Sequence, residues 1–295
     1  MTASPITHVG VVAKSRLQAA TPHLVDVEAW FDARAVSAVF ETATAALMPA
    51  SSARAVADKQ ALVASVGLVL VLGGDGTLLS MADCIAHAGR RVPILGVNFG
   101  SLGFLTEVTL PELYPALDAA LAGRARVEER LMLRATTIRP SAPPQMEIAV
   151  NDVVINKAAR SRLIDLSVFV GDEFVMHVRA DGLIIATPTG STAYNLSAGG
   201  PVVEPSVDAL VLTPIAPHTL SNRPIVIPAS ATVRVKPVMG ERDEAFVTFD
   251  GQAGFELRSG DEISVSRADE PMRLIRPATR SYFEVLREKL NWGQR

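Results

Sequence analysis

The clearest sign of chemistry in the sequence is an aspartate in the middle of a glycine-rich turn. Residues 66–72 form a continuous apolar run, which ends abruptly in the Gly-Gly-Asp-Gly-Thr segment of residues 73–77. Glycines let the backbone turn sharply and let a phosphate approach the exposed N–H groups. A carboxylate among such glycines is electrostatically unfavourable unless it accepts a proton or holds a metal ion. The turn therefore indicates phosphoryl transfer, with Asp75 as either a base or a metal ligand.

Asp75 also has a purely structural explanation when it is taken alone. An aspartate in a tight turn often caps the helix that follows it. The residues of this turn do not decide between capping and catalysis, so the interpretation depends on the other polar segments of the chain.

Three further loops have an unusual composition. Asn151 and Asp152 begin one apolar run, Asp181 precedes another, and residues 187–201 combine hydroxyl groups, small side chains and glycines. Such a segment can donate hydrogen bonds to phosphates or sugars, and its small side chains leave room for a ring system. The alternatives are ordinary turns and a flexible surface loop, although solvated linkers rarely keep residues such as Tyr194.

The common nucleotide-binding motifs are absent from the sequence. The chain contains neither Gly-x-Gly-x-x-Gly nor Gly-x-x-x-x-Gly-Lys-Ser/Thr, which excludes a standard dinucleotide fingerprint and a P-loop. No spacing of His and Cys suggests a structural zinc site.

Taken together and in order, these segments resemble the bacterial NAD kinase family over nearly the whole chain. The Gly-Gly-Asp-Gly motif alone also occurs in phosphofructokinases and in lipid kinases of the diacylglycerol and sphingosine type. The Thr-Gly-Ser-Thr-Ala-Tyr stretch is far more specific. The matching segments are residues 73–77, 151–152, 180–182, 189–201, 214–224 and 250–252.

The resemblance implies transfer of the γ-phosphoryl group of ATP to the 2′-hydroxyl of the adenosine ribose of NAD, which gives NADP. An alcohol is a weak nucleophile, so a positioned carboxylate should take its proton. The resemblance assigns that role to Asp75 and predicts that Gly74, Gly76 and Thr77 present backbone N–H groups to the ATP phosphates. A divalent ion, which we expect to be Mg²⁺, should neutralise charge on the transferred group, and its ligands are not predicted.

The resemblance also implies a set of contacts with NAD. Asn151 and Asp152 match residues that grip NAD in the family, and position 152 is Asp where many relatives have Glu. The shorter side chain keeps the chemistry of the ribose contact but changes its reach. The other positions that match NAD contacts are Arg162, Arg179, Asp181, Thr192, Ala193, Tyr194, Ser197 and Gln252.

Two alternative functions compete with a NAD kinase. A lipid kinase that shares the glycine turn should have an apolar slot and a membrane-facing surface, and the sequence has no evident basic amphipathic helix. A non-catalytic sensor of NAD(P) would bind the dinucleotide without turnover and would have no need of Asp75.

Composition limits the partners and the compartment. The net charge of −3 gives no broad basic field, so we expect no nucleic-acid partner. No apolar stretch approaches the ~18 residues of a membrane span, and residues 1–12 do not resemble a secretory signal. The single Cys84 excludes a disulfide framework. We expect a cytoplasmic protein with small-molecule nucleotides as partners, and the family resemblance implies a homodimer or homotetramer with active sites completed across subunits.

The periodicity predicts two domains. Residues 1–123 alternate buried strands with helices, which predicts a doubly wound, Rossmann-like α/β domain. Residues 124–276 consist of short alternating runs and predict a mostly β domain, a layered sheet or sandwich that binds NAD. The tail of residues 277–295 returns to helical spacing, and we expect this helix, with Trp292, to dock on the first domain.

Particular elements follow from these runs. The first domain should contain strands over 6–13, 66–72 and 92–97 and helices over 77–88 and 110–122. The second domain should contain strands over 130–139, 147–155, 163–170, 173–178, 182–187, 232–238, 245–249 and 262–267.

Overall fold

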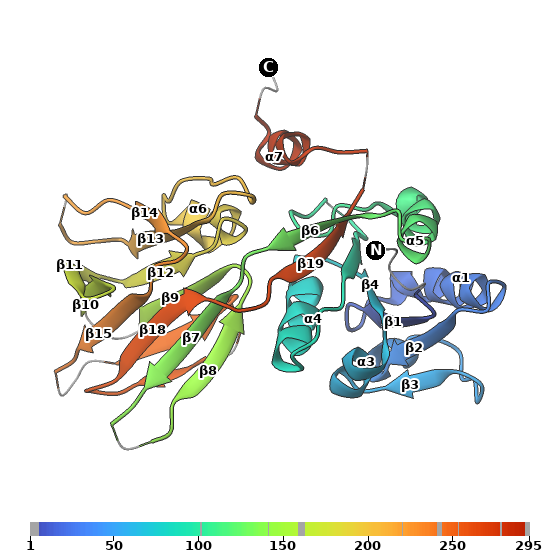
Figure 1. Ribbon diagram of the computed structural model, residues 1–295, viewed down its shortest axis with the longest axis horizontal. Helices are drawn as coiled ribbons and strands as arrows, with labels where there is room; N and C mark the ends of the chain where they lie inside the picture. Colours follow the sequence, from blue (N-terminus) through green and yellow to red (C-terminus); the bar gives the residue numbers. More distant parts are fainter. Residues whose placement is uncertain are drawn as a thin grey trace. The chain divides into compact units, whose positions relative to one another are not determined.

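The computed structural model divides the chain into two compact units, which are described separately here (Figure 1). One consists of Met1–Glu129 and Met272–Arg295, and the other of Arg130–Pro271. The described residues are 6–100, 102–140, 142–158, 163–219, 221–240, 244–252, 254–277 and 279–292.

The first unit is built on a seven-stranded sheet with the order β3-β2-β1-β4-β5-β19-β6. The pairs β1–β2, β2–β3, β1–β4, β4–β5 and β5–β19 are parallel. All five residues of β4 are buried, as expected for the strand that leads into the glycine turn. The strands are β1 (His8–Ala13), β2 (Ser37–Glu41), β3 (Ala55–Ala57), β4 (Leu68–Leu72), β5 (Ile94–Val97), β6 (Arg126–Arg130) and β19 (Met272–Arg276).

Helices cover both faces of this sheet, which confirms the predicted doubly wound α/β fold. Buried residues of α1 and α5 pack in one core with Leu68, Leu70 and Leu72. On the other face, α3 and α4 pack closely against glycines of the sheet. A Cβ at Gly10 would lie 2.3 Å from Leu62 of α3, and a Cβ at Gly96 would lie 2.7 Å from Leu78 of α4. The helices are α1 (Thr21–Asp32), α2 (Thr42–Ala45), α3 (Lys59–Ser65), α4 (Asp75–His87), α5 (Leu113–Leu121) and α7 (Tyr282–Leu290), with 3₁₀ turns at Gln18–Ala20 and Leu110–Glu112.

Helix α4 follows the glycine turn without a gap. It begins at Asp75, two residues before the predicted start, because Gly74 is still extended and accepts the first backbone bonds of the helix, from Thr77 and Leu78. Gly89 has a φ of +60° and ends the helix as predicted, since glycine adopts this conformation without strain.

The strand order places a topological switch point between β1 and β4. The chain runs from β1 outward to β2 and β3 on one side, and from β4 to β5 on the other side. Ligands of such sheets bind outside the carboxyl ends of the strands at this point. Lys14 follows β1 and donates its N–H to the carbonyl of Leu72, so the loops after β1 and β4 lie together.

The second unit consists of two six-stranded sheets, which confirms the predicted mostly β, layered domain. One sheet has the order β11-β10-β15-β18-β7-β8 and the other β14-β13-β12-β9-β16-β17. A single apolar core joins Leu166 and Val235 of the first sheet with Ile185 and Val247 of the second. The strands are β7 (Leu133–Ile138), β8 (Gln145–Ala149), β9 (Asp152–Lys157), β10 (Ile164–Val170), β11 (Glu173–Ala180), β12 (Gly182–Ala186), β13 (Ala209–Ile215), β14 (Ile225–Pro228), β15 (Val233–Val238), β16 (Ala245–Phe249), β17 (Phe255–Leu257) and β18 (Glu262–Arg267).

Several elements differ from the sequence-based expectation. The single run predicted over 147–155 is two strands, β8 and β9, separated by a turn at Val150 and Asn151. Strand β13 was not predicted, although it lies inside its sheet and pairs with both β12 and β14. It contains Pro214, a residue that is unusual within a central strand.

The end of the chain returns to the first unit. Strand β19 pairs with β5 inside the seven-stranded sheet, and α7 begins with a capping box in which Ser281 and Glu284 bond each other's backbone. Val285 and Leu286 of α7 are buried, but the expectation that Trp292 docks was wrong, because this side chain is 52% exposed. Within the described part of the chain, no helix has the length and apolar character needed to cross a membrane.

A buried ion pair holds β19 in place and supports a stability prediction. Arg276 donates to the Glu107 carboxylate at 2.6 and 2.9 Å and to Glu128 at 3.0 Å, and the side chains of Arg276 and Glu107 are 5% and 2% exposed. Arg276→Met leaves a buried carboxylate without its cation, so we expect it to lower the free energy of unfolding by about 3–5 kcal/mol. Urea denaturation measures this change.

The control for this prediction lies on the same strand. Arg273 pairs with the exposed carboxylate of Glu129 at 3.4 Å, and Arg273→Met should change the free energy of unfolding by less than about 1 kcal/mol. Equal losses of unfolding free energy in Arg276→Met and Arg273→Met would contradict the prediction that the buried ion pair contributes more to stability.

Candidate active site

The glycine turn forms one wall of a cavity at the switch point of the first unit. The cavity has a volume of about 380 Å³. It is bounded by the loop after β1, the carboxyl end of β2 and the first residues of α3 and α4. Its lining residues are Val12, Ala13, Lys14, Ser15, Glu41, Lys59, Gly74, Gly76, Thr77 and Ser80.

The charges around this cavity suit a polyanion. Lys14 and Lys59 each bring an ammonium group, and the Lys59 Nζ donates to Ser80 Oγ at 2.7 Å. The positive end of the α4 dipole adds to their field. Neither lysine was predicted as a site residue. The available signal was that Lys14 directly follows the first buried strand, where loops of α/β sheets carry ligand contacts.

The backbone of the turn is only partly available to a phosphate. Gly74, Gly76 and Thr77 all line the cavity. The N–H of Thr77, however, donates to the carbonyl of Gly74 at 3.0 Å. The hydroxyl of Thr77 is therefore the donor that this residue can offer to a ligand.

Asp75 turns its carboxylate away from this cavity and toward the loop that follows β5. Its Oδ2 accepts the N–H of Phe104 at 2.9 Å. Its Oδ1 accepts the N–H groups of Leu105 at 3.2 Å and Thr106 at 2.9 Å, and the Thr106 hydroxyl at 2.8 Å. These bonds connect two different loops, so the simple explanation that Asp75 caps its own helix does not describe its role.

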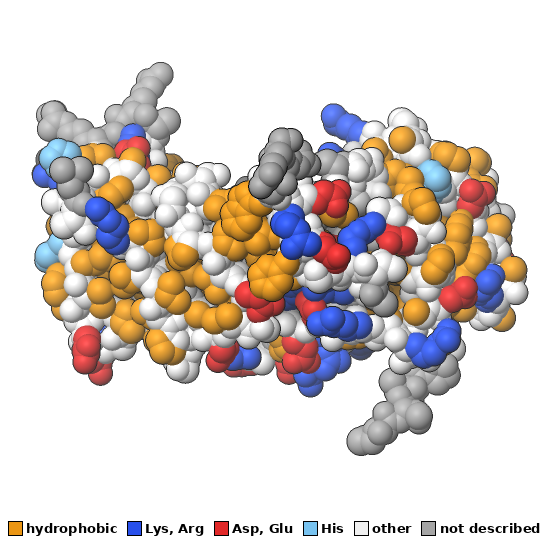
Figure 2. Space-filling model, turned by 90° about the horizontal axis from the view of Figure 1, so that it is seen from above, with side chains coloured by type: hydrophobic (Ala, Val, Ile, Leu, Met, Phe, Trp, Pro, Cys, Tyr) orange, Lys and Arg blue, Asp and Glu red, His pale blue; other side chains and the backbone are white. Residues whose placement is uncertain are grey.

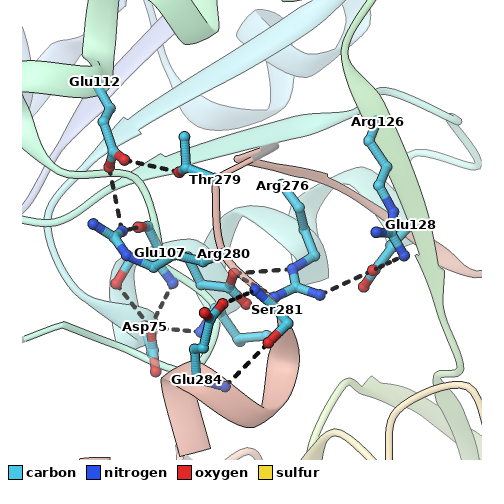
Figure 3. A network of polar contacts seen from close by, with 12 residues as sticks. Asp75, Glu107, Glu112, Arg126, Glu128, Arg276, Thr279, Arg280, Ser281 and Glu284 are labelled. Atoms are coloured by element: carbon cyan, nitrogen blue, oxygen red, sulfur yellow. Dashed lines mark hydrogen bonds and ion pairs between the residues drawn. The ribbon is translucent and has the colours of Figure 1, made fainter. Parts of the chain in front are cut away.

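The loop that holds Asp75 is itself anchored by the end of the chain (Figure 3). A Cβ at Gly103 would lie 2.1 Å from Asp75 Oδ1, so only glycine leaves room for the carboxylate here. Next to the loop, Glu107 is bound by Arg276, and its carbonyl accepts a hydrogen bond from Arg280 Nη1 at 2.7 Å. Arg276 and Arg280 thus anchor the segment next to the loop that binds the Asp75 carboxylate.

In the second unit, a carboxylate clamps the turn that carries Asn151 and Asp152. Asp250 accepts the N–H of Val150 at 2.9 Å through Oδ2, and those of Asn151 and Asp152 at 2.6 and 3.2 Å through Oδ1. Asp250 has a φ of +52° and precedes Gly251 at +66°. Sequence reasoning placed Asp250 in a matching motif but did not predict this clamp.

The segment of residues 187–201 forms a scaffold that buried side-chain hydrogen bonds hold in place, unlike the flexible surface loop considered as an alternative. Asn195 is fully buried; its Nδ2 donates to the carbonyls of Ser191 and Pro201, both at 3.0 Å, and its Oδ1 accepts the Thr213 hydroxyl at 2.6 Å. A Cβ at Gly190 would lie 2.0 Å from the carbonyl oxygen of Asn151. The segment therefore packs directly on the turn that Asp250 clamps.

This scaffold leaves the predicted contact residues accessible. It contains a 3₁₀ turn (Gly190–Thr192) and the short helix α6 (Tyr194–Ser197). Thr192 and Ala193 are half-buried, whereas Tyr194 and Ser197 are exposed.

The predicted dinucleotide contacts fall into two groups at opposite ends of β12. Ala186 pairs with Asp152 at one end and Gly182 pairs with Asn156 at the other, which separates the ends by about 13 Å at ~3.3 Å per residue. Asn151, Thr192, Ala193, Tyr194, Ser197 and Gln252 belong with the Asp152 end. Arg179 and Asp181 belong with the other end, where Asp181 lies 3.7 Å from Lys157. Arg162 lies outside the described residues.

Asp152 has the most strongly perturbed acidity among these residues. Its side chain is almost completely buried, with 3% of the residue exposed. Burial, and next the negative charge of Asp250, raise the pKa of Asp152 to about 7. Near neutral pH this group is therefore poised between donating and accepting a hydrogen bond, which suits contact with a sugar hydroxyl.

The raised pKa of Asp152 predicts a pH-dependent effect on stability. Above the ordinary pKa of 3.8 the unfolded chain loses this proton while the folded chain keeps it, so the folded state becomes relatively less stable until pH exceeds about 7. We expect Asp152→Asn to be more stable than the parent protein by a few kcal/mol at pH 8, and equally stable near pH 4. Thermal unfolding at several pH values measures the difference.

An exposed carboxylate provides the control for this measurement. Asp172→Asn removes a carboxylate whose side chain is fully accessible, and it serves as the exposed reference variant at the same pH values. A constant difference for Asp152→Asn would contradict the assigned acidity.

Comparison with known proteins places this arrangement in a family. Residues 10–125 match the ATP-NAD kinase N-terminal domain and residues 150–277 the ATP-NAD kinase C-terminal domain. The NAD kinase of Geotalea daltonii is 52% identical over 228 residues, 77% of this chain and 79% of that protein. The NAD kinase of Syntrophotalea carbinolica is 44% identical over 287 residues, 97% and 99% of the two chains. The crystal structure of yeast NADH kinase complexed with NADH aligns with a TM-score of 0.90 at 26% identity, over 99% of this chain and 89% of that chain. The chain therefore belongs to the ATP-NAD kinase family, whose reaction is the ATP-dependent phosphorylation of NAD to NADP.

Proposed function

We propose that Asp75 is the general base of the NAD kinase reaction in this protein. In that role it takes the proton of the ribose 2′-hydroxyl as the hydroxyl oxygen attacks the γ-phosphorus of ATP. The observation that carries the proposal is the fixed carboxylate, which is held by the loop after β5 directly beside the cavity that Gly74 and Gly76 line. A base aimed away from the phosphate cavity does not repel the phosphates at close range.

The donor triphosphate occupies the cavity of the first unit in this proposal. Gly74 and Gly76 offer backbone N–H groups, Thr77 offers its hydroxyl, and Lys14 and Lys59 neutralise charge. Electrostatic stabilisation by fixed donors and cations provides most of the catalysis in phosphoryl transfer, because the protein itself has little covalent chemistry to do.

The divalent metal ion that the family uses fits this arrangement. Mg²⁺ is bound mainly by substrate phosphates and water, with one or two protein carboxylates. Glu41 is the carboxylate that lines the cavity, and its Oε2 is held by the N–H and hydroxyl of Thr44 at 2.8 and 2.9 Å. Among the residues described, no group of three His, Cys, Asp or Glu side chains could hold a metal ion. When bound, the ion neutralises charge on the transferred group.

The acceptor NAD is held by the second unit in this proposal. An amide and a carboxylate, Asn151 and Asp152, suit the adenine and the ribose hydroxyls, and the Asp250 clamp fixes the backbone that carries them. The accessible residues Thr192, Ala193, Tyr194, Ser197 and Gln252 complete the contacts at this end of β12.

Arg179 and Asp181 act, in our proposal, on the dinucleotide of a neighbouring protomer in a homodimer or homotetramer. They lie at the far end of β12 from Asp152. The second unit also exposes large apolar side chains suitable for a subunit contact, and Figure 2 shows apolar side chains spread over this unit, at the left of the view. These exposed residues include Phe174, Val175, Val226, Val238 and Phe246.

We also propose that the protein is cytoplasmic. The chain has one cysteine, Cys84, which is free, as is common in a reducing compartment. On the face shown in Figure 2, acidic and basic side chains are interspersed among the described residues, which suits small-molecule substrates better than nucleic acid.

Replacement of the base tests the central assignment. Asp75→Asn keeps the shape of the side chain but cannot accept the proton, so we expect kcat to fall by ~10²–10⁴-fold. The assay incubates the protein with ATP, Mg²⁺ and NAD and detects NADP with a dehydrogenase that accepts only NADP. Asp83 on the same helix pairs with exposed His87, and Asp83→Asn serves as the matched control with unchanged kcat. Full activity in Asp75→Asn would exclude Asp75 as the base.

Mixing two inactive variants tests the shared site. If one protomer supplies Asp75 and its neighbour supplies Asp181, mixed oligomers of Asp75→Asn and Asp181→Asn contain some sites with both native residues. Activity should therefore return after the two variants are unfolded together and refolded. Each variant refolded alone is the control. A mixture no more active than its parts would place both residues in the site of a single protomer.

A further inference from the structure

We propose that Thr106 is a positioning residue, whose hydroxyl holds one oxygen of the Asp75 carboxylate so that the other oxygen, Oδ2, receives the substrate proton. The inference rests on the proposed role of Asp75 as the base. In the step, the ribose O–H bond breaks, the proton goes to Oδ2, and the hydroxyl oxygen bonds to the γ-phosphorus as ADP leaves with the electron pair of the broken P–O bond.

The two oxygens of Asp75 have unequal surroundings. Oδ1 accepts three hydrogen bonds, from Leu105 N, Thr106 N and Thr106 Oγ1 at 3.2, 2.9 and 2.8 Å. Oδ2 accepts one, from Phe104 N at 2.9 Å. Each carboxylate oxygen has about two lone-pair sites, so Oδ1 is saturated while Oδ2 keeps the capacity to bind a hydroxyl.

Asn98 sets the direction of the Thr106 hydroxyl. The Asn98 Nδ2 donates to Thr106 Oγ1 at 3.2 Å, which leaves the hydroxyl proton of Thr106 for Asp75. The amide is oriented in turn by its Oδ1, which accepts the N–H of Gly100 at 2.6 Å. Thr106 is 0% and Asn98 8% exposed, so water does not compete readily for these bonds. The chain of donors runs in one direction, from amide to hydroxyl to carboxylate.

The segment around Thr106 is braced on its other side. Glu107 is bound through its carboxylate by Arg276 and through its carbonyl by Arg280 (Figure 3). Gly103 provides the space into which the Asp75 carboxylate and the Thr106 hydroxyl fit, since a Cβ there would lie 2.1 and 2.4 Å from them. The position of the hydroxyl is therefore determined by the protein before any substrate arrives, as an efficient base requires.

A kinetic double-mutant cycle separates positioning from a merely structural role. A hydrogen bond to a charged group contributes ~1.5–3 kcal/mol, so Thr106→Val should lower kcat by ~10–100-fold while KM for ATP and NAD stays within about twofold. Thr106→Ser restores the hydroxyl and should recover kcat to within about threefold of the parent. In the Asp75→Asn background, Thr106→Val should change kcat by less than about twofold, because the group that it positions is absent.

A matched control tests the loss of a buried threonine hydroxyl as such. Thr137 is buried on β7, and its hydroxyl has no hydrogen-bond partner among the described residues, so Thr137→Val should leave kcat unchanged. If Thr106→Val does not fold, Thr106→Ala removes the same hydroxyl and enters the same cycle.

The outcomes distinguish this inference from the proposed function. Full activity in Asp75→Asn overturns the base assignment, and the inference with it. If Asp75→Asn has a strongly reduced kcat, the base assignment stands and Thr106→Val decides the inference. The inference alone is overturned if Thr106→Val keeps the kcat of the parent protein, or if it lowers kcat equally in the parent and in the Asp75→Asn background.

Discussion

The hydrogen bonds between the Asp75 carboxylate and the backbone of residues 104–106 are the constraint on which the first unit's site depends. They tie the loop after β4 to the loop after β5 at the carboxyl edge of the sheet. Because the carboxylate is engaged there, it stays out of the cavity that the neighbouring glycines line. In the proposed mechanism, this one side chain separates the space for the donor phosphates from the position of the proton acceptor.

The second unit uses the same physical device. Asp250 accepts hydrogen bonds from three consecutive backbone N–H groups. The buried Asn195 bonds two carbonyls of its own loop and the hydroxyl of Thr213. In both units a carboxylate accepts backbone N–H groups that the sheets leave unpaired, whereas the Asn195 amide donates to two backbone carbonyls. The resulting loops are irregular but fixed, which is what binding of a flexible dinucleotide requires.

The sequence predicted the elements whose signals are local. The apolar run before Asp75 predicted a buried strand, and Gly89 ended its helix where the backbone needs a positive φ. Contacts between segments distant in the sequence were not predictable in this way. Lys14 borders the cavity only because β1 pairs with β4, and Asp250 clamps residues that precede it by about a hundred positions.

Other misses have their own physical causes. Strand β13 was not predicted, and within it Thr213 and Pro214 interrupt the apolar run. Trp292 was expected to dock because it is large and apolar, yet the buried face of α7 ends with Val285 and Leu286. Of the candidate site, residue types and motifs were predictable from sequence, whereas the separation of Arg179 and Asp181 from Asp152 depends on the register of β12.

The place of β19 inside the seven-stranded sheet has a consequence for how the protein is made. The sheet order puts β19 between β5 and β6, although residues 272–276 are translated after both of these strands and after the β-rich unit. During synthesis, β5 therefore lacks a neighbour on one edge while the whole β-rich unit is being translated and can fold. The nascent first unit exposes an unpaired, apolar strand edge for that interval, a state in which chaperone binding or aggregation competes with completion of the sheet.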